Sequence, residues 1–340
     1  MRKLTSKDKL FLLGRSFFTL DGLWMIKLEE ISNWDMALKI DTNVWEILLK
    51  IIIRRLKKYL GLHNNSLENL LKILTFRWSV EGWEFKALAH KGGYKIEIKN
   101  CPYNSAMDRN PSRHDKIPLI CRDMCIPFYK EIVHSYNPLI KLKREKFMGL
   151  GDDICSFDFS YHEKPPKGYS RDINDFTLTS LTESDKLFYF EKNFRTLDGL
   201  WVVETEKELG WEITLQLDTV VWQELYKIMF RRVIKYLKIP DNSITSLVKI
   251  LSFIWNCEEN THEIQHISED HVIMKIIECP YIESMERNPE RHKHISAICE
   301  KMCSNYLIPV INDFNPKIGI SKRSSIGLGN KSCDFIIEYS

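Results

Sequence analysis

Apolar side chains recur at helical spacing in three segments near the start of the chain. Residues 6–31 are expected to form a first helix, and residues 66–75, which open with a serine, a third. Between them, residues 43–60 carry an apolar stripe with basic side chains on the opposite side, which is typical of an amphipathic helix. Asp41 and Thr42 are expected to cap the beginning of this second helix.

The pattern then changes from helical spacing toward alternation. Residues 76–90 are rich in aromatic and β-branched side chains, and residues 94–99 alternate between polar and apolar positions. Both patterns are typical of strands. Gly92 and Gly93 lie between the two segments, so we predict a hairpin.

The rest of this half of the chain predicts one more helix and one more hairpin. Residues 102–111 are expected to form a loop, and residues 115–135 a helix that ends before Pro138. Residues 141–147 and 154–160 have the pattern of two strands around a glycine-containing turn. The order is therefore helices, hairpin, helix, hairpin, which predicts an α+β module with an antiparallel sheet and helices on one side.

The chain repeats itself. A Leu-Asp-Gly-Leu-Trp motif at residues 20–24 returns 177 residues later at residues 197–201, and one inserted residue raises the offset to 178 further on. A single insertion over this length indicates two tandem copies of a whole domain rather than a solenoid. The expected domains are residues 1–162 and 185–340, joined by a linker at residues 163–184 that is rich in turn-forming residues.

Composition restricts the class of protein. The chain has 340 residues, of which 44% are hydrophobic and 28% charged, as expected for a globular protein with two cores. A formal net charge of +3 provides no electrostatic footprint for nucleic acid, so no nucleic-acid partner is expected. The apolar runs are too short for a signal peptide or a bilayer-spanning helix. We therefore expect a cytoplasmic protein with no membrane partner, in which thiols stay reduced.

Each copy carries four cysteines in the same order. The second and third lie four residues apart in a predicted helix, so both thiols point to one face. Four thiolates in a reducing compartment suit tetrahedral zinc or an iron–sulfur cluster, which predicts one such metal site in each copy. The expected ligands are Cys101, Cys121, Cys125 and Cys155 in the first copy and Cys279, Cys299, Cys303 and Cys333 in the second.

Two other interpretations of the cysteines stay open. The chain has no Cys-x-x-Cys pair, and cysteine also behaves as a small buried hydrophobe, so the thiols can be inert core residues. Alternatively, Cys101 or Cys121 is a nucleophile with His114 as its base. Cys257 has no counterpart in the first copy and is expected to be structural.

A second group of residues suggests a pocket for a small molecule. An aspartate on the apolar first helix is expected to pair with a tryptophan N–H or an arginine inside a pocket, unless it is simply exposed. A loop with arginine and histidine suits a carboxylate or phosphate, but helix capping and surface ion pairing are the favoured interpretation of these residues. The tryptophans fill either a core or a cavity wall. The candidate ligand-binding residues are Asp21, Trp24, Arg109, His114, Asp198, Trp201, Arg287 and His292; the sequence assigns no catalytic residue.

Three stretches carry a resemblance to a known family. They are the Leu-Asp-Gly-Leu-Trp helix, the segment from Trp34 to Trp45, and the late Cys-x-Phe strand at residues 155–157. They resemble a prokaryotic and archaeal family allied to L-2-amino-thiazoline-4-carboxylic acid hydrolase, and the resemblance covers both copies. It implies opening of a thiazoline ring. The Gly-Asp-x-x-Cys-x-Phe ending at residues 151–157 is more distantly similar to vinyl-reductase-type small-ligand domains, some of which hold zinc through cysteines.

Three functions agree with these features. The first is a binding protein that holds a metal or an iron–sulfur cluster through its cysteines, with a small molecule as a possible ligand. The second is a hydrolase that acts on a C–N or C–S bond. The third is a scaffold with buried structural thiols, in which the duplication forms an internal pseudo-dimer.

Overall fold

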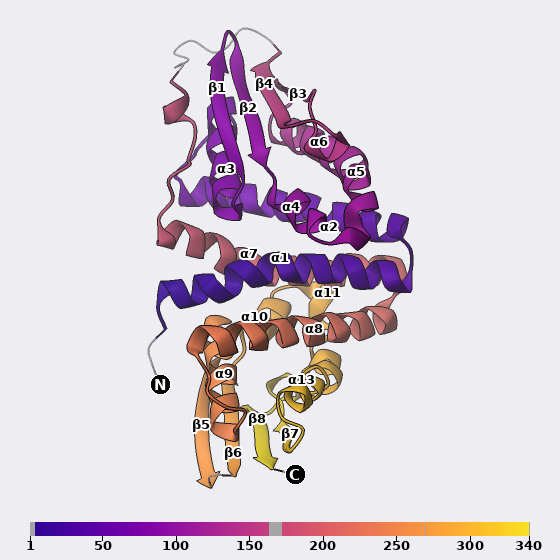
Figure 1. The fold of residues 1–340 in the computed structure, drawn as a ribbon, viewed down its shortest axis with the longest axis vertical. Coiled ribbons are helices and arrows are strands. Elements are labelled where there is room, and N and C mark those ends of the chain that lie inside the picture. Colours follow the sequence, from indigo (N-terminus) through magenta and orange to yellow (C-terminus); the bar gives the residue numbers. More distant parts are fainter. Residues whose placement is uncertain (1–3, 163–171, 269, 340) are drawn as a thin grey trace. The chain divides into compact units, whose positions relative to one another are not determined.

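The computed structural model describes residues 4–162, 172–268 and 270–339. It confirms the predicted α+β class, because the same order of helices, hairpin, short helices and hairpin occurs twice (Figure 1). The predicted linker at residues 163–184 falls partly outside the described residues. None of the helices in the described part of the chain is long and apolar enough to cross a membrane.

The elements of the first repeat are α1 (Ser6–Ile31), α2 (Trp34–Tyr59), α3 (Leu67–Glu81), β1 (Glu84–His90), β2 (Gly93–Asn100), α4 (Pro102–Asp108), η1 (Pro111–Lys116), α5 (Ile117–Leu119), η2 (Ile120–Cys125), α6 (Ile126–Tyr136), β3 (Ile140–Lys143), η3 (Met148–Leu150) and β4 (Cys155–Tyr161). After η4 (Ile173–Asp175), the second repeat contains α7 (Glu183–Leu209), α8 (Trp211–Leu237), α9 (Ile244–Cys257), β5 (Thr261–Ser268), β6 (His271–Glu278), α10 (Pro280–Glu286), α11 (Pro289–His292), α12 (Ile295–Ala297), η5 (Ile298–Met302), α13 (Leu307–Phe314), β7 (Ile318–Ser324), η6 (Ile326–Leu328) and β8 (Cys333–Tyr339).

Each repeat contains a four-stranded antiparallel sheet with the same strand order. The order is β1-β2-β4-β3 in the first repeat and β5-β6-β8-β7 in the second (Figure 1). In β2, Tyr94, Ile96 and Ile98 are buried, whereas Lys95 and Glu97 between them are only half-buried. This alternation is typical of an antiparallel sheet with helices on one face, as predicted.

The chain divides into two compact units that do not coincide with the two repeats. One unit contains residues 42–189, and the other contains residues 1–41 together with residues 190–340. Helix α1 therefore belongs to the unit that the second repeat builds. Within that unit it packs along α8, where the rings of Phe11 and Tyr236 stack with their centroids 4.0 Å apart.

Helix α2 begins earlier than predicted. The Asn33 side chain accepts a hydrogen bond from the backbone N–H three residues later, which provides the cap that we had assigned to Asp41 and Thr42. Ala37 and Ile40 are fully buried and extend the apolar stripe toward the amino end. Asp41 is consequently a buried residue inside the helix, and the prediction of a cap at this position is wrong.

The boundary between α3 and β1 also differs from the prediction. Trp78 and Val80 belong to the helix, which continues to Glu81, so the predicted strand at residues 76–90 begins only with β1. Both side chains are buried, and burial on several sides of a helix overrides their preference for strands. Gly82 ends the helix with φ of +83°, a conformation that glycine adopts without strain.

The two predictions that follow the first hairpin are also wrong in detail. The predicted loop contains α4, because Pro102 at its first position is well suited to begin a helix. The single helix predicted at residues 115–135 is broken into pieces, with Pro118 and Pro127 each near the beginning of a new piece. Between these prolines, η2 winds as a π-helix.

Candidate functional site

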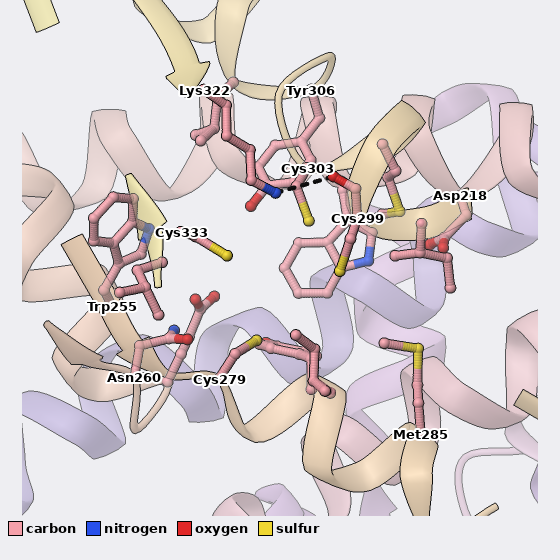
Figure 2. Close-up of a pocket in the computed structure, with 18 of the residues that line it drawn as sticks. Asp218, Trp255, Asn260, Cys279, Met285, Cys299, Cys303, Tyr306, Lys322 and Cys333 are labelled. Atoms are coloured by element: carbon pink, nitrogen blue, oxygen red, sulfur yellow. Dashed lines mark hydrogen bonds between the residues drawn. The ribbon is translucent and has the colours of Figure 1, made fainter. Parts of the chain in front are cut away.

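The second repeat encloses a cavity of about 90 Å³, enough for several water molecules or a small ligand group. Its wall includes residues from α7, α8, α10, η5, β7 and β8, so positions far apart in the sequence meet at one place. The four cysteines of this repeat are among them. Figure 2 shows the sulfur atoms of Cys279, Cys299, Cys303 and Cys333 around a common space.

Cys299 and Cys303 face the cavity from one irregular helical turn. Cys299 lies in the π-helix η5, and Cys303 follows directly after it. Such π-turns occur often at functional sites. The ammonium group of Lys322 on β7 donates a hydrogen bond to the carbonyl oxygen of Cys299 at 2.9 Å (Figure 2).

This arrangement favours a thiolate at Cys299. The hydrogen bond from the Cys303 thiol and the positive charge of Lys322 together lower the pKa of Cys299 to about 6, against the opposing effect of burial. The same hydrogen bond and burial raise the pKa of Cys303 well above its usual value. At neutral pH the pair therefore holds one thiolate and one thiol, and the thiolate is the nucleophilic form.

Gly327 allows the Cys299 sulfur to lie against the backbone. A Cβ atom at this position would collide with that sulfur, and the Gly327 N–H donates a hydrogen bond that also lowers the pKa of Cys299. Gly149 has the same relation to Cys121 in the first repeat. A side chain at Gly327 must therefore displace the thiolate from its hydrogen-bond donors.

Replacing Gly327 by alanine is expected to raise the pKa of Cys299 by roughly one unit from its value of about 6, so the pH at which its alkylation rate reaches half of the plateau should rise by the same amount. The rate is measured as a function of pH by mass spectrometry of the labelled peptide after brief exposure to iodoacetamide. Gly149→Ala is the matched control and should leave Cys299 unchanged. Equal midpoints in all three proteins would contradict the role assigned to Gly327.

Three buried carboxyl groups also line the cavity: Asp198, Asp218 and Glu258. Burial raises the pKa of each of them, in the case of Glu258 to about 8. The Trp222 indole N–H donates to Asp198 at 3.0 Å, and the Tyr226 hydroxyl donates to Glu258 at 2.9 Å. Strongly shifted carboxyl groups in a cavity are typical of functional sites.

The glycine of the repeated Leu-Asp-Gly-Leu-Trp motif makes room for an arginine in this repeat. A Cβ atom at Gly199 would lie 2.8 Å from Nη1 of Arg291, so the guanidinium group lies close against α7. There it approaches Asp198 to 3.8 Å. Asp198 and Arg291 both line the cavity, and the motif therefore contributes directly to the site.

The first repeat has the same four cysteines in a different electrostatic setting. Burial raises the pKa of Cys101 to about 12 and that of Cys121, the counterpart of Cys299, to about 11. Arg144 stands at the position of Lys322, and its guanidinium donates to the Cys125 sulfur at 3.2 Å. It also lies 3.8 Å from the centre of the Phe157 ring. Cys121 is therefore a protonated thiol at neutral pH.

A second difference between the repeats concerns a glutamate. Glu81, the counterpart of Glu258, lies 2.8 Å from the Arg77 guanidinium, and both side chains are almost completely buried. The Trp83 indole N–H and the Tyr189 hydroxyl also donate to this carboxylate. Ile254 replaces Arg77 in the second repeat, so Glu258 lacks the ion pair that Glu81 has.

The predicted metal sites are not supported by the arrangement of side chains. Among the residues that the structure describes, no group of three or more histidine, cysteine, aspartate or glutamate side chains is placed to hold a metal ion. The thiols also lie beside the Lys322 or Arg144 cation, and burial keeps Cys279 protonated by raising its pKa to about 11. The residues as they lie therefore do not fit a zinc ion or an iron–sulfur cluster.

Among the predicted ligand-binding residues of the two long helices, only Asp198 lines the cavity. Trp24 and Trp201 are fully buried core residues whose rings stack 5.8 Å apart. The Trp201 indole N–H donates to Asp21 at 3.0 Å, which is the aspartate–tryptophan pairing that the sequence suggested. Of these four predicted residues, Asp198 is therefore the one that lines the cavity of the second repeat.

The four predicted residues of the cationic loop lie on the surface, although Arg291 from the same loop lines the cavity. Arg109, His114, Arg287 and His292 are all exposed, and the last two are not part of the cavity wall. Nε2 of His114 donates to the backbone carbonyl of Asp108 at 2.7 Å. The interpretation of His114 as the base for a reactive thiol therefore has no support from its position.

Asp218, Glu258 and Lys322 line the cavity but are not among the residues predicted from the sequence. A signal existed for the two acids, because Asp41 and Glu81 recur at the repeat offset within otherwise apolar helical segments. A carboxylate that is repeated at a buried position indicates a polar cavity or an ion pair. Lys322 gave a weaker signal: a cation recurs at its position as Arg144, but Lys322 lies in a strand beside Arg323, as exposed lysines often do.

Two family models match the chain, one in each repeat. Residues 27–159 match the family described as L-2-amino-thiazoline-4-carboxylic acid hydrolase. Residues 181–298 match a family of unknown function, DUF6125. The two matches agree with the two-module architecture. No curated protein and no solved structure matches the chain.

Proposed function

We propose that the cavity of the second repeat is the active site of a thiol-dependent hydrolase that cleaves a C–N or C–S bond in a small molecule. Cys299 is the nucleophile in this proposal. The observation that carries it is the position of Cys299 at the cavity beside Cys303 and Lys322, a setting that lowers its pKa to about 6. A thiolate that is populated at neutral pH and faces a cavity is suited to covalent catalysis.

The reaction has two steps. The Cys299 thiolate attacks an electrophilic carbon of the substrate, which forms a C–S bond to the enzyme and breaks the C–N or C–S bond to the leaving group. The leaving group departs with a proton, for which Asp218 is the donor, because burial and Asp198 raise its pKa well above the usual range. Water then cleaves the covalent intermediate, releases the product and returns the thiolate and the Asp218 proton.

The family comparison supports a hydrolase in a general way. The hydrolase family matches the first repeat, whereas the thiolate lies in the second. Because both repeats share the same cysteines in the same order, the likeness extends to the second copy by the internal repetition. In this proposal the first repeat has a structural role, because its Cys121 is protonated and its Glu81 is held in an ion pair with Arg77.

Hydrolysis of L-2-amino-thiazoline-4-carboxylate by the full-length protein is the experiment that tests this proposal. Ring opening is followed by chromatography of the products. Cys299→Ser is expected to lower the rate by about 10³-fold or more, because a serine hydroxyl is not ionised at neutral pH. Cys121→Ser, at the matched position of the first repeat, should retain the rate. Equal loss in both variants, or none in Cys299→Ser, would refute the assignment of the nucleophile.

A metal or cluster protein is the second candidate, because four sulfurs gather at one cavity in the second repeat. It requires the side chains to move from the positions that they occupy here. Elemental analysis of protein purified without oxygen distinguishes the two candidates. Zinc or iron bound in proportion to the protein, and lost in Cys299→Ser, would favour the metal protein.

A further inference from the structure

The cavity of the second repeat contains buried polar atoms that the protein leaves without a partner. Oε1 of Glu258 and Oδ1 of Asp218 have no hydrogen-bond partner among the described residues, and both side chains are only 2% exposed. Both residues line the cavity. A buried acceptor without a donor costs about 1–3 kcal/mol, so native proteins rarely retain one without a purpose.

Lys322 and Arg291, the two cations that line the cavity, interact with groups other than the Glu258 carboxylate. Lys322 donates to the carbonyl oxygen of Cys299, and Arg291 lies beside Asp198. The Tyr226 hydroxyl donates to the other carboxylate oxygen of Glu258 at 2.9 Å. The nearby Arg195 donates to the backbone carbonyl of Glu258 at 3.3 Å and forms its ion pair with Glu259 instead. Burial raises the pKa of Glu258 to about 8, although the Arg195 charge opposes this rise. A ligand that carries a positive charge and N–H donors would hold this carboxyl group ionised and complete its hydrogen bonds.

The first repeat shows what fills the corresponding place when the chain supplies its own cation. The Arg77 guanidinium lies 2.8 Å from Glu81 and 5.1 Å from the centre of the Trp45 ring. The counterparts of these two residues, Glu258 and Trp222, both line the cavity, and the counterpart of Arg77 is Ile254. The second repeat therefore retains the carboxylate and the aromatic ring but has no guanidinium of its own at this position.

We infer that the cavity binds a small ligand through a guanidinium group, which pairs with Glu258 and lies over Trp222. The charge-assisted hydrogen bonds to the carboxylate fix the orientation of the planar cation, and the indole face adds a cation–π contact. This inference names the ligand chemistry of the proposed active site and rests on the function of that cavity as a binding site. It does not require Cys299 to react.

Binding is measured by calorimetry in the full-length Cys299→Ser protein, so that failure of thiol chemistry cannot obscure the result. The probes are methylguanidinium, its neutral isostere methylurea, and acetate. Methylguanidinium is expected to bind at least tenfold more tightly than methylurea. Glu258→Gln should weaken methylguanidinium binding by about tenfold or more, whereas it should change methylurea binding little.

A second variant transfers the arrangement of the first repeat. Ile254→Arg places a guanidinium on the chain itself and is expected to abolish methylguanidinium binding. Glu258→Gln, which retains the shape of the side chain, keeps the inference testable if Ile254→Arg does not fold. The inference is overturned if methylurea binds as tightly as methylguanidinium, if acetate is the preferred probe, or if no probe binds.

Discussion

Replacement of Glu81 by glutamine is expected to destabilise the protein, whereas the same replacement of its counterpart Glu258 is expected to stabilise it. Glu81 forms a buried ion pair with Arg77, and its loss leaves a buried guanidinium without a counterion. Breaking a buried pair in this way costs about 3–5 kcal/mol. The free energy of unfolding of Glu81→Gln should fall by this amount.

The opposite sign at Glu258 follows from linkage. Its pKa is raised from 4.5 to about 8 in the folded protein, so the folded state binds the proton more tightly than the unfolded state. The stability that this group contributes is complete below about pH 4.5 and is lost as pH rises to about 8. Glutamine cannot ionise and should therefore raise the free energy of unfolding by about 2–4 kcal/mol at pH 9, with little effect at pH 4.

Urea unfolding of the wild type and of both variants at several pH values measures these differences. The wild type should lose stability between about pH 5 and pH 8 through Glu258, and Glu258→Gln should remove that part of the loss. If Glu258→Gln is more stable than the wild type but no longer binds a guanidinium group, Glu258 lowers stability in order to bind its ligand, as functional residues often do. Destabilisation of similar size in both variants would contradict the difference that we draw between the repeats.

Alkylation should distinguish Cys299 from Cys121 despite their matched positions. With pKa values of about 6 and about 11, their thiolate fractions differ by roughly 10⁴ at pH 7. A less basic thiolate is a weaker nucleophile, which removes about two of these orders of magnitude. Cys299 is also more buried than Cys121. Slower access of the reagent therefore reduces the expected advantage of Cys299 to between about tenfold and a hundredfold.

The rates are measured by brief labelling with iodoacetamide, a small neutral reagent, and by mass spectrometry of the cysteine-containing peptides. The rate at Cys299 should follow the appearance of its thiolate near pH 6, and the rate at Cys121 should rise only in strongly alkaline solution. Lys322→Met should shift the profile of Cys299 to higher pH, because the neighbouring positive charge is removed. Parallel profiles for the two cysteines would contradict the account.

The repeat and the amphipathic patterns were sufficient to predict the fold class and the order of elements. The first helix was placed correctly from its apolar spacing, and in the structure a capping box at Thr5 stabilises its beginning. Trp78 and Val80 led to a wrong boundary, because packing around α3 overrides the strand preference of such residues. The assignment of α1 to the unit of the second repeat depends on contacts between distant segments, which local patterns do not contain.

The site could be predicted only in part. The cysteines attract attention by their chemistry and their repetition, and those of the second repeat do line one cavity. Their protonation depends on Lys322 and on the backbone at Gly327, and the sequence shows neither proximity. The replacement of Arg77 by Ile254 is one of many differences between the two copies in the sequence. Its consequence, the loss of an ion pair to Glu258, depends on the position of Glu258 in the cavity wall.

Titration of the thiolate by its ultraviolet absorbance tests the central claim most directly. The difference between the wild type and Cys299→Ser, recorded from pH 4 to pH 10 with reduced protein, isolates the contribution of one sulfur. We predict a single thiolate that appears with a midpoint near pH 6 and is absent from the variant. Identical titrations of the two proteins below pH 8 would show that Cys299 stays protonated at neutral pH and would contradict its role as the nucleophile.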